Sequence, residues 1–351
     1  MIINMSLKKY KYLSVIVPSY NRADEISILL TSLMELDFPE ECFEVIIADD
    51  GSMDNTENIV LEFKKKVKFK LSYHAQSNKG PGEARNLGMN VADGDFFIFV
   101  DSDVSVPDYW LTNIDTGINN ENADAFGGPD TFRDDFPALL KAINYSMTSF
   151  ITTGGMRGKK GKKLAKYYPR SFNMGLSRAL WEKIGGFGSL RHGQDIEFSN
   201  RIIQSGAKVI FIENAEVYHK RRTNLKRFYK QVFNWGVARI NLYKIDSSML
   251  EPLHLMPAIV TLLICLFFIL SIFSDFFLTF VLFGFVLGII VLFISMIDAF
   301  VLYKKLSPAL LLPLVMPAQI IGYGMGFIYN FIRRIVLKRG EKVGFKKNYY
   351  K

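Results

Sequence analysis

Short apolar runs alternate with amphipathic stretches over roughly the first hundred residues. Strands are predicted at four places, 13–17, 43–48, 67–73 and 96–100, and the last of these is wholly apolar. Such a run bounded by turn residues is typical of a strand buried on both faces. Apolar residues at helical spacing separate the strands, as at Ile26, Leu29, Leu30 and Leu33. This alternation implies right-handed crossovers and a parallel sheet. We therefore predict an α/β domain of a nucleotide-binding type.

The pattern loosens after Asp124 and continues as an α+β region to His219. Residues 223–244 are predicted to be helical, with apolar positions set among lysines and arginines. A basic amphipathic helix of this kind is typical of one that lies in the plane of lipid headgroups. Packing against the preceding domain is the alternative. The predicted organisation is a domain over 1–222, an interfacial helix and linker over 223–250, and a membrane region over 251–351.

Three runs without charge dominate the C-terminal region: 255–273 with 19 residues, 276–297 with 22 and 306–332 with 27. A helix that crosses a bilayer needs about 20 apolar residues, so the first two are predicted spans. The third run is interrupted by Pro308, Pro313 and Pro317. We predict that it forms a bent or interfacial pair of helices, with a full third span as the alternative.

The distribution of basic residues predicts a multi-pass membrane protein with its N-terminal α/β domain in the cytoplasm. The start of the chain, 1–11, lacks the pattern of a signal peptide. A hairpin turning at Ser274-Asp275 returns Lys304 and Lys305 to the inside, as the positive-inside rule prefers. A third crossing would place outside a tail with eight Lys or Arg and the single acid Glu341.

The net charge of +9 does not indicate a nucleic-acid partner. Its basic residues cluster at 157–166, 220–230 and after Phe331, and the last two clusters adjoin membrane segments. Anionic lipid headgroups are the simpler partner. The Gly- and Lys-rich stretch 157–166 is predicted to be a mobile loop. Cys42 and Cys265 have neither disulfide nor metal-site spacing.

Two carboxylates, Asp101 and Asp103, follow the apolar strand 96–100 directly. In open α/β sheets, ligands bind at the carboxyl ends of the strands. Two hard oxygen ligands there suit Mg²⁺ or Mn²⁺ bridging a diphosphate. A solvated Asp-Ser-Asp turn is the alternative, since these are ordinary turn residues.

Three further polar segments lie near predicted strand ends or helix starts. They are Pro18-Ser19-Tyr20-Asn21-Arg22, Asp49-Asp50-Gly51-Ser52 and Gly193-Gln194-Asp195-Ile196-Glu197. An aromatic ring and carboxylates at successive strand ends can stack on and hydrogen-bond a base, while Asp101 and Asp103 handle ribose and diphosphate. Together these segments predict a nucleotide site.

Residues 12–240 resemble the family 2 glycosyltransferases, which have the GT-A fold. The resemblance rests on motifs in a specific order: 15–21 (VIVPSYN), 48–52 (ADDGS), 82–88 (GEARNLG), 100–103 (VDSD) and 193–195 (GQD). It implies a Rossmann-like, mostly parallel catalytic domain followed by a helical membrane region. It also implies an inverting enzyme that uses a nucleotide-sugar donor, most often a UDP-sugar, and a divalent metal, Mg²⁺ or Mn²⁺.

The resemblance assigns roles to individual residues. Tyr20 and Asp50 would hold the base of the donor, with Pro18 lining the same pocket. Asp101 would contact the ribose or help to place the metal, and Asp103 would ligate it. Asp195 matches the carboxylate that acts as catalytic base, and a position in the first helical turn favours its ionised form.

Some positions depart from the family pattern or support two interpretations. Gln194 stands where family members usually have Glu. Arg85 is predicted either to reach the diphosphate or to form a salt bridge. His219 is a candidate third metal ligand, with a diphosphate contact or a plain surface histidine as alternatives. The segment 231–235 resembles the Gln-x-x-Arg-Trp motif of processive synthases, but Asn234 replaces the arginine.

These features together predict a membrane-bound, metal-assisted inverting glycosyltransferase. A base takes the proton of the acceptor hydroxyl as it attacks the anomeric carbon, and a metal neutralises the leaving diphosphate. The membrane segments favour a lipid-linked or envelope-glycan acceptor. A processive polysaccharide synthase and a non-catalytic nucleotide-sugar-binding membrane subunit are the competing interpretations.

Overall fold

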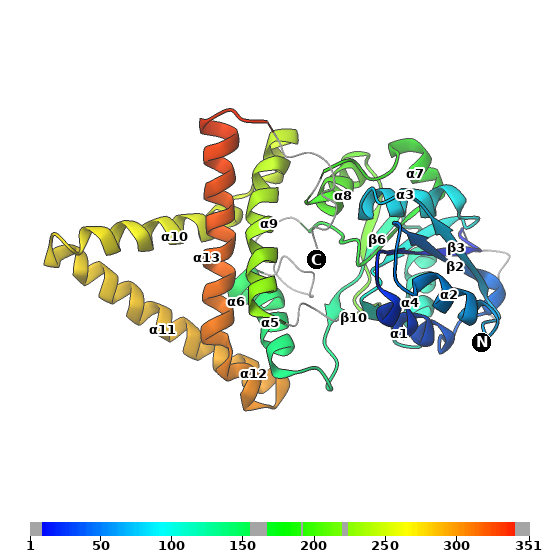
Figure 1. The fold of residues 1–351 in the computed structure, drawn as a ribbon, viewed down its shortest axis with the longest axis horizontal. Coiled ribbons are helices and arrows are strands. Elements are labelled where there is room, and N and C mark those ends of the chain that lie inside the picture. The colour runs from blue at the N-terminus through cyan, green and yellow to red at the C-terminus, as the bar shows by residue number, and fades with distance from the viewer. Residues whose placement is uncertain (1–8, 155–166, 191, 220–223, 341–351) are drawn as a thin grey trace.

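The computed structural model of the chain describes residues 9–154, 167–190, 192–219 and 224–340. It has two parts, a sheet domain covered by helices and a group of long C-terminal helices (Figure 1). The predicted mobile loop at 157–166 lies outside the described residues.

The central sheet has seven strands in the order β3-β2-β1-β4-β8-β6-β9. Four of them form a parallel group in which β1 pairs with β2 and β4, and β2 pairs with β3. β8 joins this group antiparallel to β4. The mostly parallel α/β sheet predicted from the sequence is confirmed. The strand bounds are β1 Leu13–Ser19, β2 Phe43–Asp49, β3 Lys70–Ala75, β4 Phe96–Val100, β6 Ala125–Gly127, β8 Asn173–Ser177 and β9 Val209–Phe211.

Helices cover both faces of this sheet, which is why β1, β2 and β4 are apolar along most of their length. On one face lie α1 Ala23–Met34, α2 Thr56–Lys64 and α4 Trp110–Asn120, and on the other α3 Pro81–Val91, α7 Arg178–Ile184 and α8 Gln194–Gln204. Side chains of a strand alternate between the faces. Val15 and Val17 accordingly join the first core and Ile16 the second.

A small second sheet lies beside the end of β4. Its strands are β5 Val104–Ser105, β10 Val217–His219 and β7 Asp130–Thr131, with β10 in the middle. β10 runs antiparallel to β5, so that His219 pairs with Val104. This pairing brings a residue from late in the chain next to the carboxylates that follow β4.

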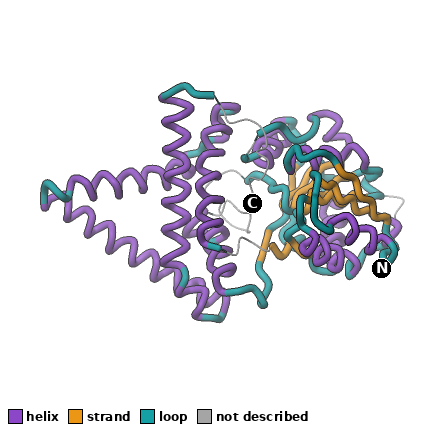
Figure 2. The backbone as a smooth tube through the Cα atoms, in the orientation of Figure 1, coloured by secondary structure: helices purple, strands orange, loops and turns teal. Residues whose placement is uncertain are grey.

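The C-terminal helices form a hairpin and a pair (Figures 1 and 2). α9 Leu225–Ile245 and α13 Leu312–Phe331 lie side by side, whereas α10 Pro252–Leu270 and α11 Asp275–Tyr303 form a hairpin that extends away from the sheet domain. Three helical segments are long and apolar enough to cross a membrane: Pro252–Leu270, Asp275–Tyr303 and Leu312–Val336. Their surfaces indicate association with a membrane. The remaining elements are α5 Ala138–Thr148, α6 Phe150–Thr153, α12 Leu306–Leu310 and the short turns Glu40–Cys42, Ser247–Met249 and Ile332–Val336.

The hairpin is almost wholly exposed, whereas α13 is partly covered. The buried residues of α11 are Ser295, Ala299 and Tyr303, all near its C-terminal end. The third apolar run bends at Leu311, where α12 gives way to α13. α9 follows α13 closely, because a Cβ at Gly236 would overlap the backbone oxygen of Tyr323. Whether α13 crosses the bilayer or lies at its surface stays a prediction.

Candidate active site

The site lies at the carboxyl edge of the parallel strands. β1 is the point at which the strand order reverses, because β2 and β3 extend to one side of it and β4 lies on the other. Ligands of open α/β sheets bind at such a switch point. Tyr20, Asp50 and Asp101 each follow a strand that ends there. Three of the predicted donor residues therefore lie at neighbouring strand ends.

Asp101, Asp103 and His219 gather into one cluster. Each offers a ligand atom, and these three atoms lie within 4.8 Å of one another. Nε2 of His219 lies 3.2 Å from Oδ1 of Asp103. All three side chains are partly exposed, so an ion could reach them. Two carboxylates and an imidazole are a donor set that fits a divalent cation such as Mn²⁺ or Mg²⁺. The cluster is a candidate metal site.

The structure adds Asp130 to this cluster, a residue that the motifs did not single out. β7 pairs with β10, and Oδ2 of the buried Asp130 lies 3.6 Å from Nδ1 of His219. The ring of Phe172 lies against the imidazole, 5.4 Å between centroids. A carboxylate behind a metal-ligating histidine orients its ring and sets its tautomer. The local sequence Gly-Gly-Pro-Asp is typical of a turn and carries no sign of this role.

Arg85 forms the salt bridge that was one of its two predicted roles. Its Nη2 lies 2.6 Å from Oδ1 of Asp101, and its guanidinium stacks 5.4 Å from the centroid of Phe187. The side chain is 7% exposed, so it is held firmly in place. Arg85 therefore orients Asp101. Contact between Arg85 and a diphosphate stays a prediction.

Asp50 is buried at the end of β2 and organises the loop that leads into α3. Its carboxylate accepts hydrogen bonds from Nε2 of Gln76 and from the backbone N–H groups of Lys79 and Gly80, at 2.7–2.8 Å. Burial raises the pKa of Asp50 despite these bonds. The neighbouring Asp49 is structural, since it accepts bonds from Gly51 and Ser52 and closes the turn after β2.

Asp195 lies in the first turn of α8. The helix begins after Gly193, whose φ of +82° belongs to the left-handed region. Nη1 of Arg170 lies 3.4 Å from Oδ2 of Asp195. The positive end of the helix dipole and this guanidinium both lie beside the carboxylate. Gln194 braces the preceding segment, because its Nε2 donates to the carbonyl of Gly188 at 3.3 Å.

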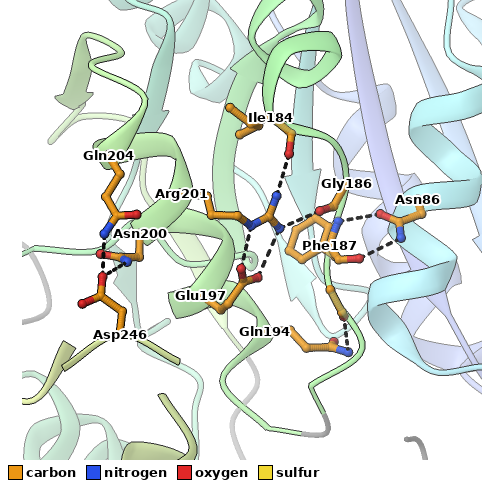
Figure 3. Close-up of polar contacts among 11 residues, drawn as sticks. Asn86, Ile184, Gly186, Phe187, Gln194, Glu197, Asn200, Arg201, Gln204 and Asp246 are labelled. Carbon is orange, nitrogen blue, oxygen red and sulfur yellow. Dashed lines mark hydrogen bonds and ion pairs between the residues drawn. The ribbon is translucent and has the colours of Figure 1, made fainter. Parts of the chain in front are cut away.

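A network of polar contacts fixes the segment before α8 (Figure 3). Arg201 donates to the carbonyls of Ile184 and Gly186 and pairs with Glu197. From the other side, Asn86 bonds the backbone of Phe187 at both its N–H and its carbonyl. Residues 184–187 are therefore tied both to α8 and to α3, which limits the positions that α8 and its Asp195 can take.

The start of α3 contacts Asp50, Asp101 and the residue before Asp195. The N–H of Gly80 bonds Asp50, and Arg85 bonds Asp101. A Cβ at Gly82 would lie 2.8 Å from Oε1 of Gln194, so this glycine lets α3 approach the residue before Asp195. Asp50, Asp101 and the residue before Asp195, far apart in the chain, thus all approach the start of α3.

Comparisons with known proteins relate the chain to glycosyltransferases. Residues 14–184 match the model of Glycosyl transferase family 2. The chain is 46% identical over 90 residues to the poly(ribitol-phosphate) beta-N-acetylglucosaminyltransferase TarS of Staphylococcus aureus, which covers 26% of this chain and 16% of TarS. The chain therefore spans only a small part of the length of that relative.

Two further similarities cover more of both chains. The chain is 25% identical over 238 residues to the dolichyl N-acetyl-alpha-D-glucosaminyl phosphate 3-beta-D-2,3-diacetamido-2,3-dideoxy-beta-D-glucuronosyltransferase of Methanococcus voltae, covering 65% of this chain and 73% of the relative. In structure it resembles the mannosyltransferase PcManGT of Pyrobaculum calidifontis, solved in complex with GDP-Man and Mn2+, with a TM-score of 0.64. That likeness covers 92% of this chain and 88% of PcManGT at 17% identity, and it shows a common fold.

Proposed function

The chain belongs to glycosyltransferase family 2 through residues 14–184, and from this premise we propose an inverting, metal-assisted enzyme at a membrane. It transfers a sugar from a nucleotide-sugar donor, a UDP-sugar, to a hydroxyl of a lipid-linked or envelope-glycan acceptor. The observation that carries the proposal is the convergence on the start of α3 of Asp50, Asp101 and the segment that holds Asp195.

Asp195 is proposed to be the catalytic base. A sugar hydroxyl is a weak nucleophile, so a carboxylate must accept its proton as the oxygen attacks the anomeric carbon. Asp195 lies in the first turn of α8, with Nη1 of Arg170 3.4 Å from its Oδ2, and these contacts hold the carboxylate in place. Attack from the face opposite the leaving diphosphate inverts the anomeric centre in a single displacement.

The donor is proposed to lie along the carboxyl ends of β1, β2 and β4. Tyr20 and Asp50, which follow β1 and β2, would hold the base, with Pro18 lining the same pocket, and Asp101, which follows β4, would contact the ribose. A divalent cation held by Asp101, Asp103 and His219 would neutralise the charge that gathers on the leaving diphosphate. Arg85 and Asp130 hold two of these ligands in position.

The membrane is proposed to receive the α10–α11 hairpin. Its surface is exposed and apolar, with Phe273 80% exposed near the tip, and water would not tolerate so large an apolar area. α9 and α13 lie side by side between the hairpin and the sheet domain (Figure 1), which favours a position along the cytoplasmic surface. The sheet domain then faces the cytoplasm, and a lipid-linked acceptor reaches it from the bilayer. The relative from Methanococcus voltae, whose name includes a dolichyl N-acetyl-alpha-D-glucosaminyl phosphate, agrees with this.

Screening the purified full-length protein for release of nucleotide from a panel of donors tests the function. The Asp195→Asn variant should lose transfer by about a hundredfold or more while it keeps donor affinity. Glu182→Gln, an exposed carboxylate on the neighbouring α7, is the matched control and should act as wild type.

Other outcomes would favour the competing interpretations. Donor binding without turnover, equal in wild type and Asp195→Asn, would indicate a binding subunit. Addition of many sugars to one acceptor before release would indicate a processive synthase. Full transfer to soluble glycans after deletion of residues 251–351 would contradict a membrane acceptor.

A further inference from the structure

Arg239 is a buried arginine at the junction of the sheet domain and the long helices. It lies in α9 and is 7% exposed. Its Nη1 donates to the carbonyl of Met249 at 2.9 Å, at the turn that precedes α10. Its Nε is buried and has no hydrogen-bond partner within the described parts of the chain.

The hydrogen bond to Met249 does not offset the unfavourable burial of the charged Arg239 side chain. Removing a guanidinium from water is unfavourable unless a counter-charge is present, and so is leaving a buried N–H without a hydrogen-bond partner. Among the residues that the structure describes, Arg239 forms no ion pair. Burial lowers the pKa of Arg239; the nearby Tyr323 opposes this shift, and the charge of Arg170 adds to it. A neutral donor would be enough to bind Met249, so the charge itself is unexplained.

The second arginine connects this position with the proposed catalytic base. Arg170 contacts Asp195 at 3.4 Å, a long distance for a charge-assisted hydrogen bond, which is usually about 2.7–2.9 Å. α9 approaches the same helix terminus, since a Cβ at Gly193 would lie 3.2 Å from Leu242 and 3.5 Å from Ala238. Two positive side chains thus lie beside the start of α8.

The surroundings of Arg239 lie on the membrane side of the molecule. Ile196 and Leu242 pack with Met249 in one apolar cluster that joins α8, α9 and the turn before α10. His254, in the first turn of α10, is buried and lies within electrostatic reach of both arginines. Beyond it the surface of α10 is exposed and apolar, as at Met256, Ile259 and Leu262.

We propose that Arg239 and Arg170 form the binding site for the phosphate group of a lipid acceptor, a site that rests on the proposed function. Guanidinium groups bind phosphate oxygens with paired N–H donors. A phosphate there supplies the counter-charge that no described residue gives Arg239, and the lipid chain continues along the apolar surface of α10. The acceptor group is then held beside Asp195. A soluble polyol phosphate offers the same anion but no chain for that surface.

Binding of a short prenyl phosphate tests this site. The full-length protein in nanodiscs of neutral lipid is titrated with citronellyl phosphate, and separately with citronellol, by isothermal calorimetry. We expect Arg239→Gln and Arg170→Gln to weaken binding of the phosphate by at least about tenfold, the loss of one charge-assisted contact, and Arg239→Lys to weaken it less. Citronellol should bind weakly and equally to all variants. Arg227→Gln, exposed on the same helix, is the control.

Each result decides the proposal. Equal affinity of wild type and both Gln variants for citronellyl phosphate would overturn it, as would equal affinity of wild type for citronellol. Arginine-dependent binding of a soluble polyol phosphate without binding of the prenyl phosphate would overturn the assignment to a lipid. Unchanged affinity for UDP-sugar shows that a variant is folded. If Arg239→Gln fails that control, Arg239→Lys and Arg170→Gln decide. Failure of wild type to bind any nucleotide sugar would contradict the proposed function, whereas the prenyl phosphate titration would still report on this site.

Discussion

Asn86 and Phe187 bind each other through two hydrogen bonds although 101 residues separate them in the chain. Nδ2 of Asn86 donates to the carbonyl of Phe187 at 3.0 Å, and Oδ1 accepts from its N–H at 2.7 Å. Arg85, the residue before Asn86, forms an ion pair with Asp101. One turn of α3 therefore positions both the candidate metal ligand Asp101 and the segment that leads to Asp195.

Asn86→Ala should impair catalysis more than donor binding. The variant loses both bonds to Phe187, each worth about 1 kcal/mol, so the free energy of unfolding should fall by about 1–3 kcal/mol. The segment before Asp195 gains freedom, and we expect kcat to fall by about tenfold or more because catalytic geometry tolerates little displacement. Steady-state kinetics and donor titration measure the two effects. Asn58→Ala on the exposed face of α2 is the control, and an unchanged kcat would contradict the positioning role.

Asp130→Asn should weaken metal binding without removing a ligand. A carboxylate behind a ligating histidine typically contributes about 10–100-fold to metal affinity. We expect the dissociation constant for Mn²⁺, measured by electron paramagnetic resonance, to rise by that factor. Asp108→Asn, an exposed aspartate after β5, should leave it unchanged. If neither Asp130→Asn nor His219→Ala changes the affinity for Mn²⁺, His219 is not a metal ligand.

Asp246 should stabilise the protein at neutral pH and lose this effect in acid. The hydrogen bond from Asn200 and those from Ser248 lower its pKa to about 2 from 3.8, and Gln204 adds a further contact. A carboxylate whose pKa is lowered on folding stabilises the fold above its unfolded pKa, and the effect disappears as the pH falls through about 2.

The expected difference in stability between wild type and Asp246→Ala is about 1 kcal/mol at neutral pH, because solvent screens this partly exposed group. Thermal unfolding of both proteins along a pH series should show the two curves converge toward pH 2. Asp37→Ala, exposed and distant from α9, serves as the control. A difference that is independent of pH would show that the side chain acts without its charge.

Gly236 and Gly326 should tolerate no side chain. A Cβ on either would overlap a backbone oxygen of the opposite helix, of Tyr323 and Phe233 respectively. Helices approach this closely only through small residues. We expect Gly236→Ala and Gly326→Ala each to lower the free energy of unfolding by about 1–3 kcal/mol. Gly284→Ala on α11 has nothing within 4 Å and should be neutral in a detergent melting assay. Equal effects at all three positions would refute close packing of α9 on α13.

The proposed topology places the tip of the hairpin outside the cell and both ends of α13 inside. In a Cys265→Ser background, where Cys42 is buried, we expect Ser274→Cys to react with a membrane-impermeant maleimide in intact cells. Lys305→Cys and Lys338→Cys should react only after the cells are opened. Labelling of Lys338→Cys from outside would show that α13 crosses the bilayer.

The strands that carry the site could be predicted because each is indicated by an apolar run of neighbouring residues. The run at 96–100 matches β4 in full, and the predicted carboxylates follow it directly. β3 begins at Lys70 rather than at the predicted residue 67. Val67 packs against the hydrophobic core but does not belong to the strand. The role of Asp130 was not predictable, since its neighbours form an ordinary turn and only the pairing of β7 with β10 brings it to His219.

The sequence by itself determined the α/β sheet, the apolar hairpin and the family motifs, because periodicity and charge are properties of neighbouring residues. Only the tertiary structure decided that Arg85 binds Asp101, that Arg170 contacts Asp195 and that Arg239 is buried with no ion-pair partner among the described residues. These contacts depend on how helices pack against strand ends, and packing joins segments whose separation along the chain carries no information about their distance in space.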